Sequence, residues 1–469
     1  MKKTKIVCSI GPASSEYATF KKMVEAGMNV ARINFSHATI EERETVVRLV
    51  KKVNEELNTH VAVLYDTKGP DFRTGILENG SIELVEGNNI RLTKEDVVGN
   101  EERLTVNYKE ALDDIHIGDH ILLEDGLMEL LVIDKDSNGL DCKVIAGGVL
   151  GDRKGINVPG VTLNVPFISD QDREDIIYAA HHDGNFLALS FVDEAADVLA
   201  VREILKDQNR EDMQIISKIE SETGIQNLDD IIRVSDGIMV ARGDLGVEVP
   251  IVNLPMYQKN IIDKCRQQGK FCIVATEMLT SMQKNARPTR AEVSDIANAV
   301  LDGTDAVMLS GETTMGKHPI EAVKYMANIC SNTEKYLDYQ SIPTTEYQDD
   351  IPSTIARGIV AATNAIEIKA ISCATTSGYT ARKISNLRPK TIILAGCPNE
   401  AVADSLAIHF GVYPVVLALG KSTDELVADC TKLAKEKLGL KTGDRVIVTG
   451  GFPNHMEVKK TNFMKIEEL

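Results

Sequence analysis

Apolar runs of strand length recur along the chain, and most of them are followed by a segment with helical spacing. The runs cover residues 5–10, 29–34, 61–66, 186–191, 214–220, 237–241, 271–276 and 306–310. Polar and apolar residues do not alternate within them, so both faces of each predicted strand are buried, as in a parallel sheet covered by helices. The intervening segments, such as 18–25, 40–57 and 193–206, have helical spacing. Eight such units predict an α/β fold, a (β/α)8 TIM barrel with its site at the carboxyl ends of the strands.

Two other parts of the chain have different patterns. More than a hundred residues separate the third and fourth predicted strands, and here short alternating runs, at 81–85, 89–93, 120–123, 127–133 and 142–146, are punctuated by Gly and Asn. One-sided strands of this kind predict a small β-barrel domain inserted in a barrel loop, where it could act as a lid. After about residue 344, a helical segment at 354–366 and apolar runs at 370–374, 391–395, 412–417 and 445–448 predict a C-terminal open α/β domain.

These patterns divide the chain into three predicted domains. The catalytic barrel covers 1–69 and 166–342, the inserted β lid domain covers 70–165, and a C-terminal α/β regulatory domain covers 343–469. A chain of 469 residues is too long for one hydrophobic core, so several domains are expected on length alone.

Charge and cysteine content narrow the class of protein. The net charge of −18 argues against a general affinity for nucleic acid or for anionic membranes. No apolar run reaches the roughly 18 residues of a membrane span, and the N-terminus carries no long apolar leader. The eight cysteines include no Cys-x-x-Cys pair, which favours buried free thiols in a reducing compartment. We therefore expect a cytoplasmic protein that binds neither nucleic acid nor membranes.

Charged residues stand at the ends of two consecutive predicted strands. Lys218 and Glu220 end the strand at 214–220, and Asp244 follows the strand at 237–241. The two carboxylates could share one divalent cation, with the lysine as a fixed positive charge beside them. A hard cation and a lysine suit the moving charge of a phosphoryl group or an enolate. On the residues alone, a pair of strand-end salt bridges remains the alternative.

Oxygen-bearing side chains stand at the ends of the second and third predicted strands. They belong to Asn34, Ser36, Asp66 and Thr67. Neutral and singly charged oxygens suit a weakly charged cation such as K⁺ better than Zn²⁺, which prefers nitrogen and sulfur. A buried hydrogen-bond network is the alternative. Nearby, Arg32 and Arg73 could fork onto phosphate oxygens or form ordinary ion pairs.

These motifs together resemble the pyruvate kinase family over essentially the whole chain. The resemblance rests on residues 32–37, 66–75, 217–220, 241–250, 275–282, 287–303 (RPTRAEVSDIANAVLDG), 308–313 (MLSGET) and 377–388. It implies transfer of the phosphoryl group of phosphoenolpyruvate to ADP, giving pyruvate and ATP in the last step of glycolysis. It also implies dependence on Mg²⁺ (or Mn²⁺) and K⁺, and a homotetramer.

The resemblance assigns roles to individual residues. The divalent cation falls on Glu220 and Asp244, and K⁺ falls on Asn34, Ser36, Asp66 and Thr67. The catalytic residues are Lys218, which stabilises the transition state, and Thr276 on the proton path, with a water relay because a threonine hydroxyl is a poor acid. Phosphoenolpyruvate contacts are implied for Arg32, Lys218, Gly243, Asp244 and Thr276. Nucleotide contacts are implied for Asn34, Ser36, His37, Arg73 and, from the lid, Lys154.

The chain departs from the family pattern at four positions. Ala38 stands where Gly is usual, Asp71 where Glu is usual, Asp193 where Arg is common and Glu277 where Gln is common. An acid at position 71 goes with K⁺ dependence in the family, and Asp71 keeps that charge on a shorter side chain. None of the four replaces a residue with an assigned catalytic role.

A run of small residues in the C-terminal domain is a candidate effector site. It comprises Thr375, Thr376, Ser377, Gly378 and Thr380, at the predicted start of a helix over 381–387. Such a run can cradle a phosphate, and the resemblance implies a phosphorylated allosteric effector there. A plain helix cap is the alternative.

Two other functions are compatible with parts of this pattern. A barrel lyase or mutase that uses Mg²⁺ and acts on phosphoenolpyruvate or a 2-oxo acid would need the carboxylates and the lysine, but no nucleotide clamp. The predicted lid with Lys154 and Arg73 therefore argues against it. A catalytically weak metabolite-binding paralogue is the other alternative, and the presence of Lys218, Glu220 and Asp244 argues against that one.

Overall fold

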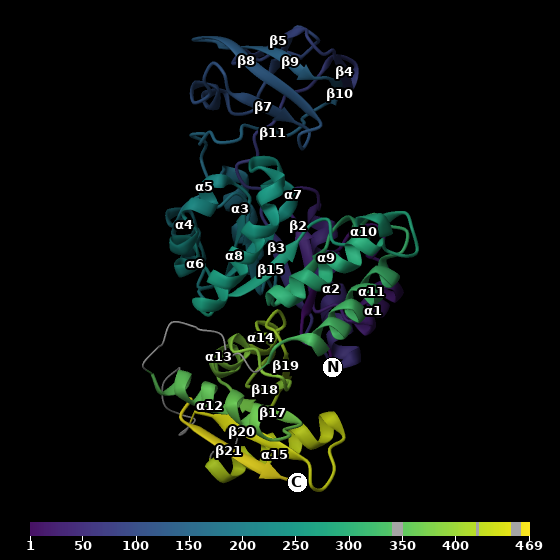
Figure 1. Ribbon diagram of the computed structural model, residues 1–469, viewed down its shortest axis with the longest axis vertical. Coiled ribbons are helices and arrows are strands. Elements are labelled where there is room, and N and C mark those ends of the chain that lie inside the picture. The colour runs from purple at the N-terminus through teal and green to yellow at the C-terminus, as the bar shows by residue number, and fades with distance from the viewer. Residues whose placement is uncertain (340–349, 419–421, 452–460) are drawn as a thin grey trace.

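The computed structural model describes residues 1–339, 350–418, 422–451 and 461–469, and its three domains follow one another along the long axis (Figure 1). The barrel lies in the middle, the β insertion lies at one end and the C-terminal α/β domain lies at the other. The predicted boundary at 342–343 lies outside the described residues.

The eight apolar runs form a closed parallel barrel, as predicted. Around the ring the strands follow the order β1-β16-β15-β14-β13-β12-β3-β2. Almost all their side chains are buried, because helices cover the outside and side chains fill the inside. The strands are β1 (Lys5–Ser9), β2 (Val30–Asn34), β3 (Ala62–Asp66), β12 (Phe186–Leu189), β13 (Gln214–Ile219), β14 (Gly237–Ala241), β15 (Phe271–Ala275) and β16 (Ala306–Leu309).

Helices between the strands form the outer layer of the barrel. They are α1 (Tyr17–Ala26), α2 (Ile40–Leu57), α3 (Asp170–His181), α4 (Ala195–Asp207), α5 (Glu222–Gln226), α6 (Leu228–Val234), α7 (Arg242–Glu248), α8 (Leu254–Gln267), α9 (Arg290–Asp302), α10 (Gly311–Thr314) and α11 (Pro319–Thr333). A capping box of Thr39 and Glu42 fixes the start of α2. Helix α7 begins directly where β14 ends, so Asp244 falls in its first turn.

The insertion is a β domain with its own hydrophobic core. Its strands are β4 (Ser81–Leu84), β5 (Asn89–Thr93), β6 (Arg103–Thr105), β7 (His120–Leu123), β8 (Met128–Asp136), β9 (Gly139–Ala146), β10 (Gly148–Gly151) and β11 (Ile156–Asn157). They form a six-stranded sheet, β11-β7-β8-β9-β5-β6, and a two-stranded one, β10-β4. The five predicted strands are present, and the three that sequence analysis missed have four residues or fewer. The buried apolar residues of the insertion form a cluster separate from that of the barrel.

The C-terminal domain is an open, mostly parallel sheet with helices. Its order is β19-β18-β17-β20-β21, in which only β21 runs antiparallel to its neighbour. The elements are α12 (Ile351–Ala365), β17 (Ala370–Ala374), α13 (Tyr379–Asn386), β18 (Ile393–Cys397), α14 (Glu400–Asp404), β19 (Val412–Val416), α15 (Thr423–Leu438), β20 (Arg445–Gly450) and β21 (Phe463–Glu468). Sequence analysis missed β21, whose residues are mostly exposed and in which charged and apolar residues are mixed.

The C-terminal domain closes the amino-terminal end of the barrel. Ala407 and Ile408 belong to the same buried apolar cluster as the residues inside the barrel. Arg388 forms an ion pair with Asp305, immediately before β16, at 2.7 Å. The opposite, carboxyl end of the barrel is left facing the insertion. All eight cysteines are buried free thiols, as expected, and no helix among the described residues is long and apolar enough to cross a membrane.

Candidate active site

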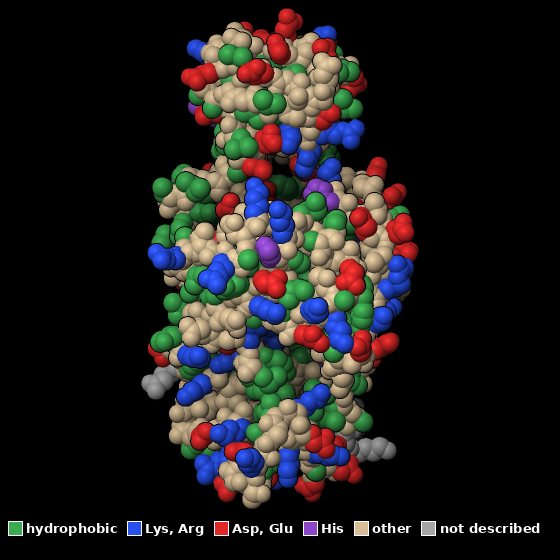
Figure 2. Space-filling view, turned by 90° about the vertical axis from the view of Figure 1, so that its right-hand side faces the viewer, with side chains coloured by type: hydrophobic (Ala, Val, Ile, Leu, Met, Phe, Trp, Pro, Cys, Tyr) green, Lys and Arg blue, Asp and Glu red, His purple; other side chains and the backbone are tan. Residues whose placement is uncertain are grey.

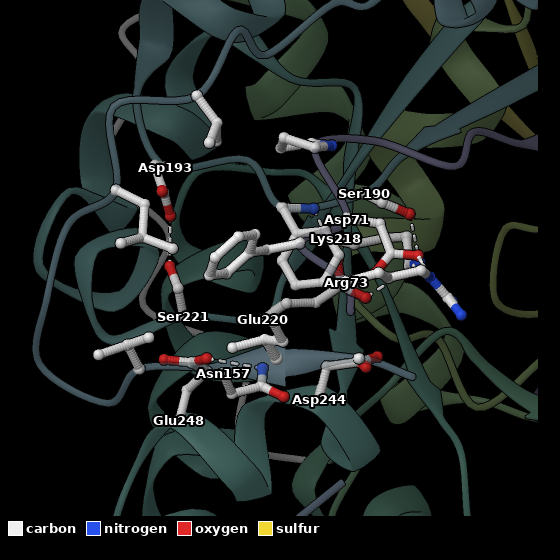
Figure 3. Close-up of a pocket in the computed structure, with 18 of the residues that line it drawn as sticks. Asp71, Arg73, Asn157, Ser190, Asp193, Lys218, Glu220, Ser221, Asp244 and Glu248 are labelled. Carbon is white, nitrogen blue, oxygen red and sulfur yellow. Dashed lines mark hydrogen bonds and ion pairs between the residues drawn. The ribbon is translucent and has the colours of Figure 1, made fainter. Parts of the chain in front are cut away.

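A cavity of about 540 Å³ lies between the carboxyl ends of the barrel strands and the insertion. In Figure 2 this region is a hollow below the insertion, with Lys, Arg, Asp and Glu side chains around it. Figure 3 shows several of the side chains that line it. Nine of the residues predicted from sequence line this one cavity: Arg32, Asn34, Ser36, Thr67, Arg73, Lys154, Lys218, Glu220 and Asp244.

The ammonium of Lys218 is held by three oxygens near the end of β13. Its Nζ donates to the Ser190 hydroxyl at 2.6 Å and lies 3.0 Å from Glu220 Oε1 and 3.3 Å from Asp66 Oδ1. Burial alone would lower the pKa of Lys218, but the carboxylates of Asp66, Glu220 and Asp244 outweigh burial and raise it. The lysine is therefore a fixed positive charge and not a base.

Glu220 is a buried carboxylate with incomplete hydrogen bonding. Its Oε2 accepts a 2.6 Å hydrogen bond from the backbone N–H of Phe191, whereas Oε1 accepts none and has only the Lys218 ion pair. Phe191 makes this contact from a left-handed conformation with φ 54°, which is strained for a bulky residue. Burial raises the pKa of Glu220 to about 8, and the negative charge of Asp244 adds to the effect. The folded protein thus leaves one buried carboxylate oxygen with an ion pair but no hydrogen bond.

This unsatisfied oxygen fits a divalent cation. Glu220 and Asp244 both line the cavity and come from the ends of neighbouring strands β13 and β14. Within the described ranges, no three His, Cys, Asp or Glu side chains are grouped as a complete metal site. Two carboxylates with open positions are the donor set that Mg²⁺ uses when substrate and water complete its shell.

The predicted monovalent-cation ligands lie at the ends of two neighbouring strands, β2 and β3, and in the segments that follow them. Asn34 and Asp66 are paired in register at the ends of β2 and β3. Asp66 Oδ2 accepts a 2.6 Å hydrogen bond from Arg32 Nε. Burial alone would raise the pKa of Asp66, but Arg32 and Lys218 together lower it, so this carboxylate is ionised. Asp66 lies behind the wall of the cavity, and Asn34, Ser36 and Thr67 form part of that wall. Their oxygen chemistry fits K⁺.

Arg73 and Lys154 lie on the insertion side of the cavity, and both are already paired with carboxylates. Arg73 Nε is 2.5 Å from Asp71 Oδ2, and Lys154 Nζ is 2.5 Å from Glu124 Oε1. A β-bridge between Arg73 and Gly155 brings the two cations into the same part of the domain. Sequence analysis left an ordinary ion pair open as the alternative for Arg73, but it did not predict the ion pair of Lys154.

Besides Asp66, three predicted residues of the barrel do not line the cavity: Thr276, Gly243 and His37. The Thr276 hydroxyl accepts from the Gly243 N–H at 2.8 Å and donates to the Ala275 carbonyl at 2.6 Å. It is held there by a backbone with φ 67°, which is strained for a β-branched residue. In this conformation Thr276 positions the backbone of Gly243. His37 is exposed in the loop after β2.

The candidate effector run joins β17 to α13. Gly378, with φ 77°, occupies the cap position of α13 without a side-chain cap. Thr380 shares a 2.7 Å hydroxyl–hydroxyl hydrogen bond with Thr461. Thr375 and Thr380 are buried.

Sequence analysis missed Ser190 and Arg242. Ser190 follows β12 and supplies the hydroxyl that receives Lys218, and its place after a barrel strand could have identified it. Arg242 donates to the Thr276 carbonyl at 2.6 Å and pairs with Asp295 at 2.8 Å. That ion pair spans α7 and α9, and no local pattern predicts it.

Comparison with known proteins gives concordant matches. The family model described as the pyruvate kinase barrel domain matches residues 1–323, and the pyruvate kinase alpha/beta domain matches 353–467. The pyruvate kinase of Bacillus licheniformis is 43% identical over 99% of this chain and 80% of its own. That of Geobacillus stearothermophilus is 44% identical over 100% and 80%, respectively. A crystal structure of a pyruvate kinase from Cryptosporidium parvum superposes with a TM-score of 0.94 at 37% identity, and covers 100% of this chain and 96% of that one.

Proposed function

The chain belongs to the pyruvate kinase family, and on that premise we propose that phosphoryl transfer from phosphoenolpyruvate to ADP takes place in the cavity between barrel and insertion. As a pyruvate kinase it is a glycolytic phosphotransferase. The observation that carries the placement is the buried, half-partnered carboxylate of Glu220, beside the Lys218 ammonium and across from Asp244.

In the proposed reaction the carboxylates of the cavity bind the metal, and its cationic side chains bind the substrate. Glu220 and Asp244 would hold Mg²⁺ or Mn²⁺, which when bound neutralises oxygens of the substrate. Arg32 and Lys218 bind the phosphate and the carboxylate of phosphoenolpyruvate, with backbone support from Gly243. Because Lys218 keeps its proton, its contribution is electrostatic, toward the charge that spreads over the transferred group and the enolate. Thr276 then acts on the proton path through water, after its hydroxyl leaves the Ala275 carbonyl.

The remaining assignments concern K⁺ and the nucleotide. Asn34, Ser36, Asp66 and Thr67 would hold K⁺, which adds one fixed positive charge to the site. Arg73 and Lys154 bind the phosphates of ADP by exchanging their present carboxylate partners for phosphate oxygens. Asn34, Ser36 and His37 complete the nucleotide contacts from the loop after β2.

Three further assignments are supported by family membership. The protein acts as a homotetramer in the cytoplasm, and the run 375–380 binds a phosphorylated effector. The glycine at the start of α13 leaves backbone N–H groups free of a side-chain cap, which favours an anion there.

The test is pyruvate formation from phosphoenolpyruvate by the purified protein, with ADP or GDP, and with K⁺ and Mg²⁺ each omitted in turn. We expect turnover only when nucleotide and both cations are present. Consumption of phosphoenolpyruvate without a nucleotide would favour the lyase or mutase alternative, which the matches to both pyruvate kinase domains do not favour.

A further inference from the structure

Arg43 contacts the loop of the predicted K⁺ ligands without lining the cavity. It lies one turn into α2, just after the Thr39–Glu42 capping box, and its side chain is buried. Its Nε donates to the Ala38 carbonyl at 2.9 Å, and its Nη2 lies 3.5 Å from the Phe35 carbonyl. The guanidinium thus holds both ends of the loop 35–38, which contains Ser36 and His37.

The same guanidinium is anchored from the opposite side. Its Nη1 donates to Asp175 Oδ1 of α3 at 2.7 Å, and both side chains are about nine-tenths buried or more. Its planar group also lies 4.2 Å from the ring centroid of Phe35 and 5.4 Å from that of Tyr178. One side chain therefore ties α2, α3 and the loop after β2 together.

The loop is in turn coupled to β3, which carries the other K⁺ ligands. The Phe35 ring stacks on Tyr65 with centroids 5.1 Å apart, and the Phe35 N–H donates to the Asp66 carbonyl at 3.0 Å. Ser36 is oriented by its N–H, which donates to Asn34 Oδ1 at 3.1 Å. The predicted ligands on the β2 side, Asn34 and Ser36, are thus packed together with those on the β3 side. Arg43 contacts this group from the side of α2 and α3.

We propose that Arg43 is a positioning residue that sets the affinity of the site for K⁺ by fixing the loop 35–38. The proposal rests on the proposed function, because it requires the K⁺ site at Asn34, Ser36, Asp66 and Thr67. K⁺ binds weakly, so its affinity depends on how well its ligands are held before it arrives. Loss of a residue that orients metal ligands typically costs 10–100-fold in affinity. A lysine cannot replace the guanidinium, because all its N–H groups belong to one nitrogen, whereas Arg43 donates from three nitrogens held in one plane.

The test compares four variants of the full chain. Arg43→Met removes the charge and keeps most of the stem, Arg43→Lys keeps the charge, and Asp175→Asn loosens the anchor while Arg43 stays. Arg48→Met, on the exposed side of the same helix, is the matched control. For each variant we would measure the K⁺ concentration for half-maximal pyruvate formation, kcat at saturating K⁺, and the Mg²⁺ midpoint. The rise of the thermal midpoint with added K⁺, at constant ionic strength, reports binding without turnover.

We expect Arg43→Met to raise the half-saturating K⁺ concentration roughly tenfold in both assays, with kcat at saturating K⁺ and the Mg²⁺ midpoint nearly unchanged. Arg43→Lys and Asp175→Asn should give smaller shifts in the same direction, and Arg48→Met none. Because the lysine variant disturbs packing least, it keeps the test decisive if the methionine variant fails to fold. If the thermal midpoint falls in the Arg43 variants while the half-saturating K⁺ concentration stays constant, the proposal for Arg43 is overturned and the proposed function stands. A parent chain that makes pyruvate without K⁺ would overturn the K⁺ assignment and this proposal with it. A parent that makes no pyruvate would overturn the proposed function.

Discussion

Nζ of Lys218 lies 3.0 Å from Oε1 of Glu220, and that oxygen accepts no hydrogen bond. The lysine supplies a positive charge but no hydrogen bond to this oxygen. The buried carboxylate oxygen can therefore take a second positive partner. The pKa values of the two groups reflect this arrangement: both are raised, the lysine by its carboxylate neighbours and the glutamate chiefly by burial. Burial of these two ionisable groups costs folding free energy, which indicates that they are kept for function and not for stability.

The first prediction concerns Lys218→Met. A point charge beside the reacting groups acts most on the transition state, so kcat should fall by about 10²–10³ or more while phosphoenolpyruvate binding largely survives. Steady-state kinetics and a direct binding measurement separate the two effects. Lys324→Met, an exposed lysine of α11, is the control. Activity of the Lys218 variant within tenfold of the parent would contradict the assignment.

The second prediction uses the pKa of Glu220, which burial raises from an ordinary 4.5 to about 8. Below pH 4.5 the carboxyl is neutral in both the folded and the unfolded state. Between pH 4.5 and 8 the unfolded chain ionises first, so folding loses stability as pH rises. Glu220→Gln should therefore raise the thermal midpoint of the metal-free protein at pH 8 by several degrees, and the gain should vanish near pH 4.5.

Mg²⁺ provides the control for this prediction. It should raise the thermal midpoint of the parent at pH 8 and leave that of the Gln variant unchanged, because the ligand is missing. Glu248→Gln removes another carboxylate from the cavity wall and should keep the Mg²⁺ response. An equal Mg²⁺ response in the Glu220 and Glu248 variants would show that Glu220 is not a metal ligand.

The third prediction concerns Asp71, which holds Arg73 at 2.5 Å on the cavity wall. Asp71→Lys should relax the K⁺ requirement, since the new ammonium would occupy roughly the place of the monovalent charge. Activity would be measured with K⁺ replaced by a bulky organic cation. Asp71→Asn removes the Arg73 partner without adding a charge, and should stay K⁺-dependent. Full activity of the parent without K⁺ would contradict the cation site itself.

The sequence predicts the barrel well and the ion pairs of the site poorly. Strands such as β14 and β15 are buried on both faces, so composition alone reveals them. β21 is an exposed strand with charges, and β11 has two residues, so neither has a distinctive pattern. The pairing of Lys154 with Glu124 depends on loop conformations that no periodicity encodes. The direction of the Thr276 hydroxyl depends on a left-handed backbone conformation. Such a conformation is expected from sequence at glycine and not at threonine.

The fourth prediction concerns His409, where the C-terminal domain meets the barrel. The ring is fully buried, packs edge-on against Phe271, and has no hydrogen-bond partner on either nitrogen. Burial, with Arg382, Lys5 and Arg388 nearby, holds its pKa well below the usual 6.5. Below pH 6.5 this histidine is protonated in the unfolded chain but stays neutral in the folded chain. The free energy of unfolding therefore decreases as pH falls.

His409→Leu should remove this part of the pH dependence. We expect the variant to unfold at a higher temperature than the parent at pH 5, with a smaller difference at pH 8, because a buried apolar group replaces one with two unsatisfied nitrogens. Thermal unfolding across that range checks the expectation. His60→Leu replaces a mostly buried histidine that is paired with Asp404, and serves as a comparison in which a partner is lost. A parent and His409 variant with the same slope of stability against pH would contradict the argument.

The last prediction concerns the insertion as a lid. Its core is separate from that of the barrel, and it contacts the barrel wall through Asn157, whose Nδ2 donates to Glu248 Oε1 at 2.7 Å. At one junction Gly69 has φ 72°, and a β-carbon there would lie 2.9 Å from the Ser190 carbonyl oxygen, so this turn requires glycine. We expect deletion of about 71–163, with a short linker, to leave a folded barrel.

This truncated protein should still bind Mg²⁺ and phosphoenolpyruvate, because Arg32, Lys218, Glu220 and Asp244 all lie on the barrel. It should lose turnover with ADP, because Arg73 and Lys154 are gone and water reaches the phosphoryl group. Asn157→Ala in the full chain tests the same idea without a deletion: loss of one contact between insertion and barrel should change the apparent KM for ADP more than the binding of phosphoenolpyruvate. A folded truncation with unchanged saturation by ADP would show that the insertion is no catalytic lid. In that case the clamp assigned to Arg73 and Lys154 would be wrong, while the metal and lysine assignments on the barrel would stand.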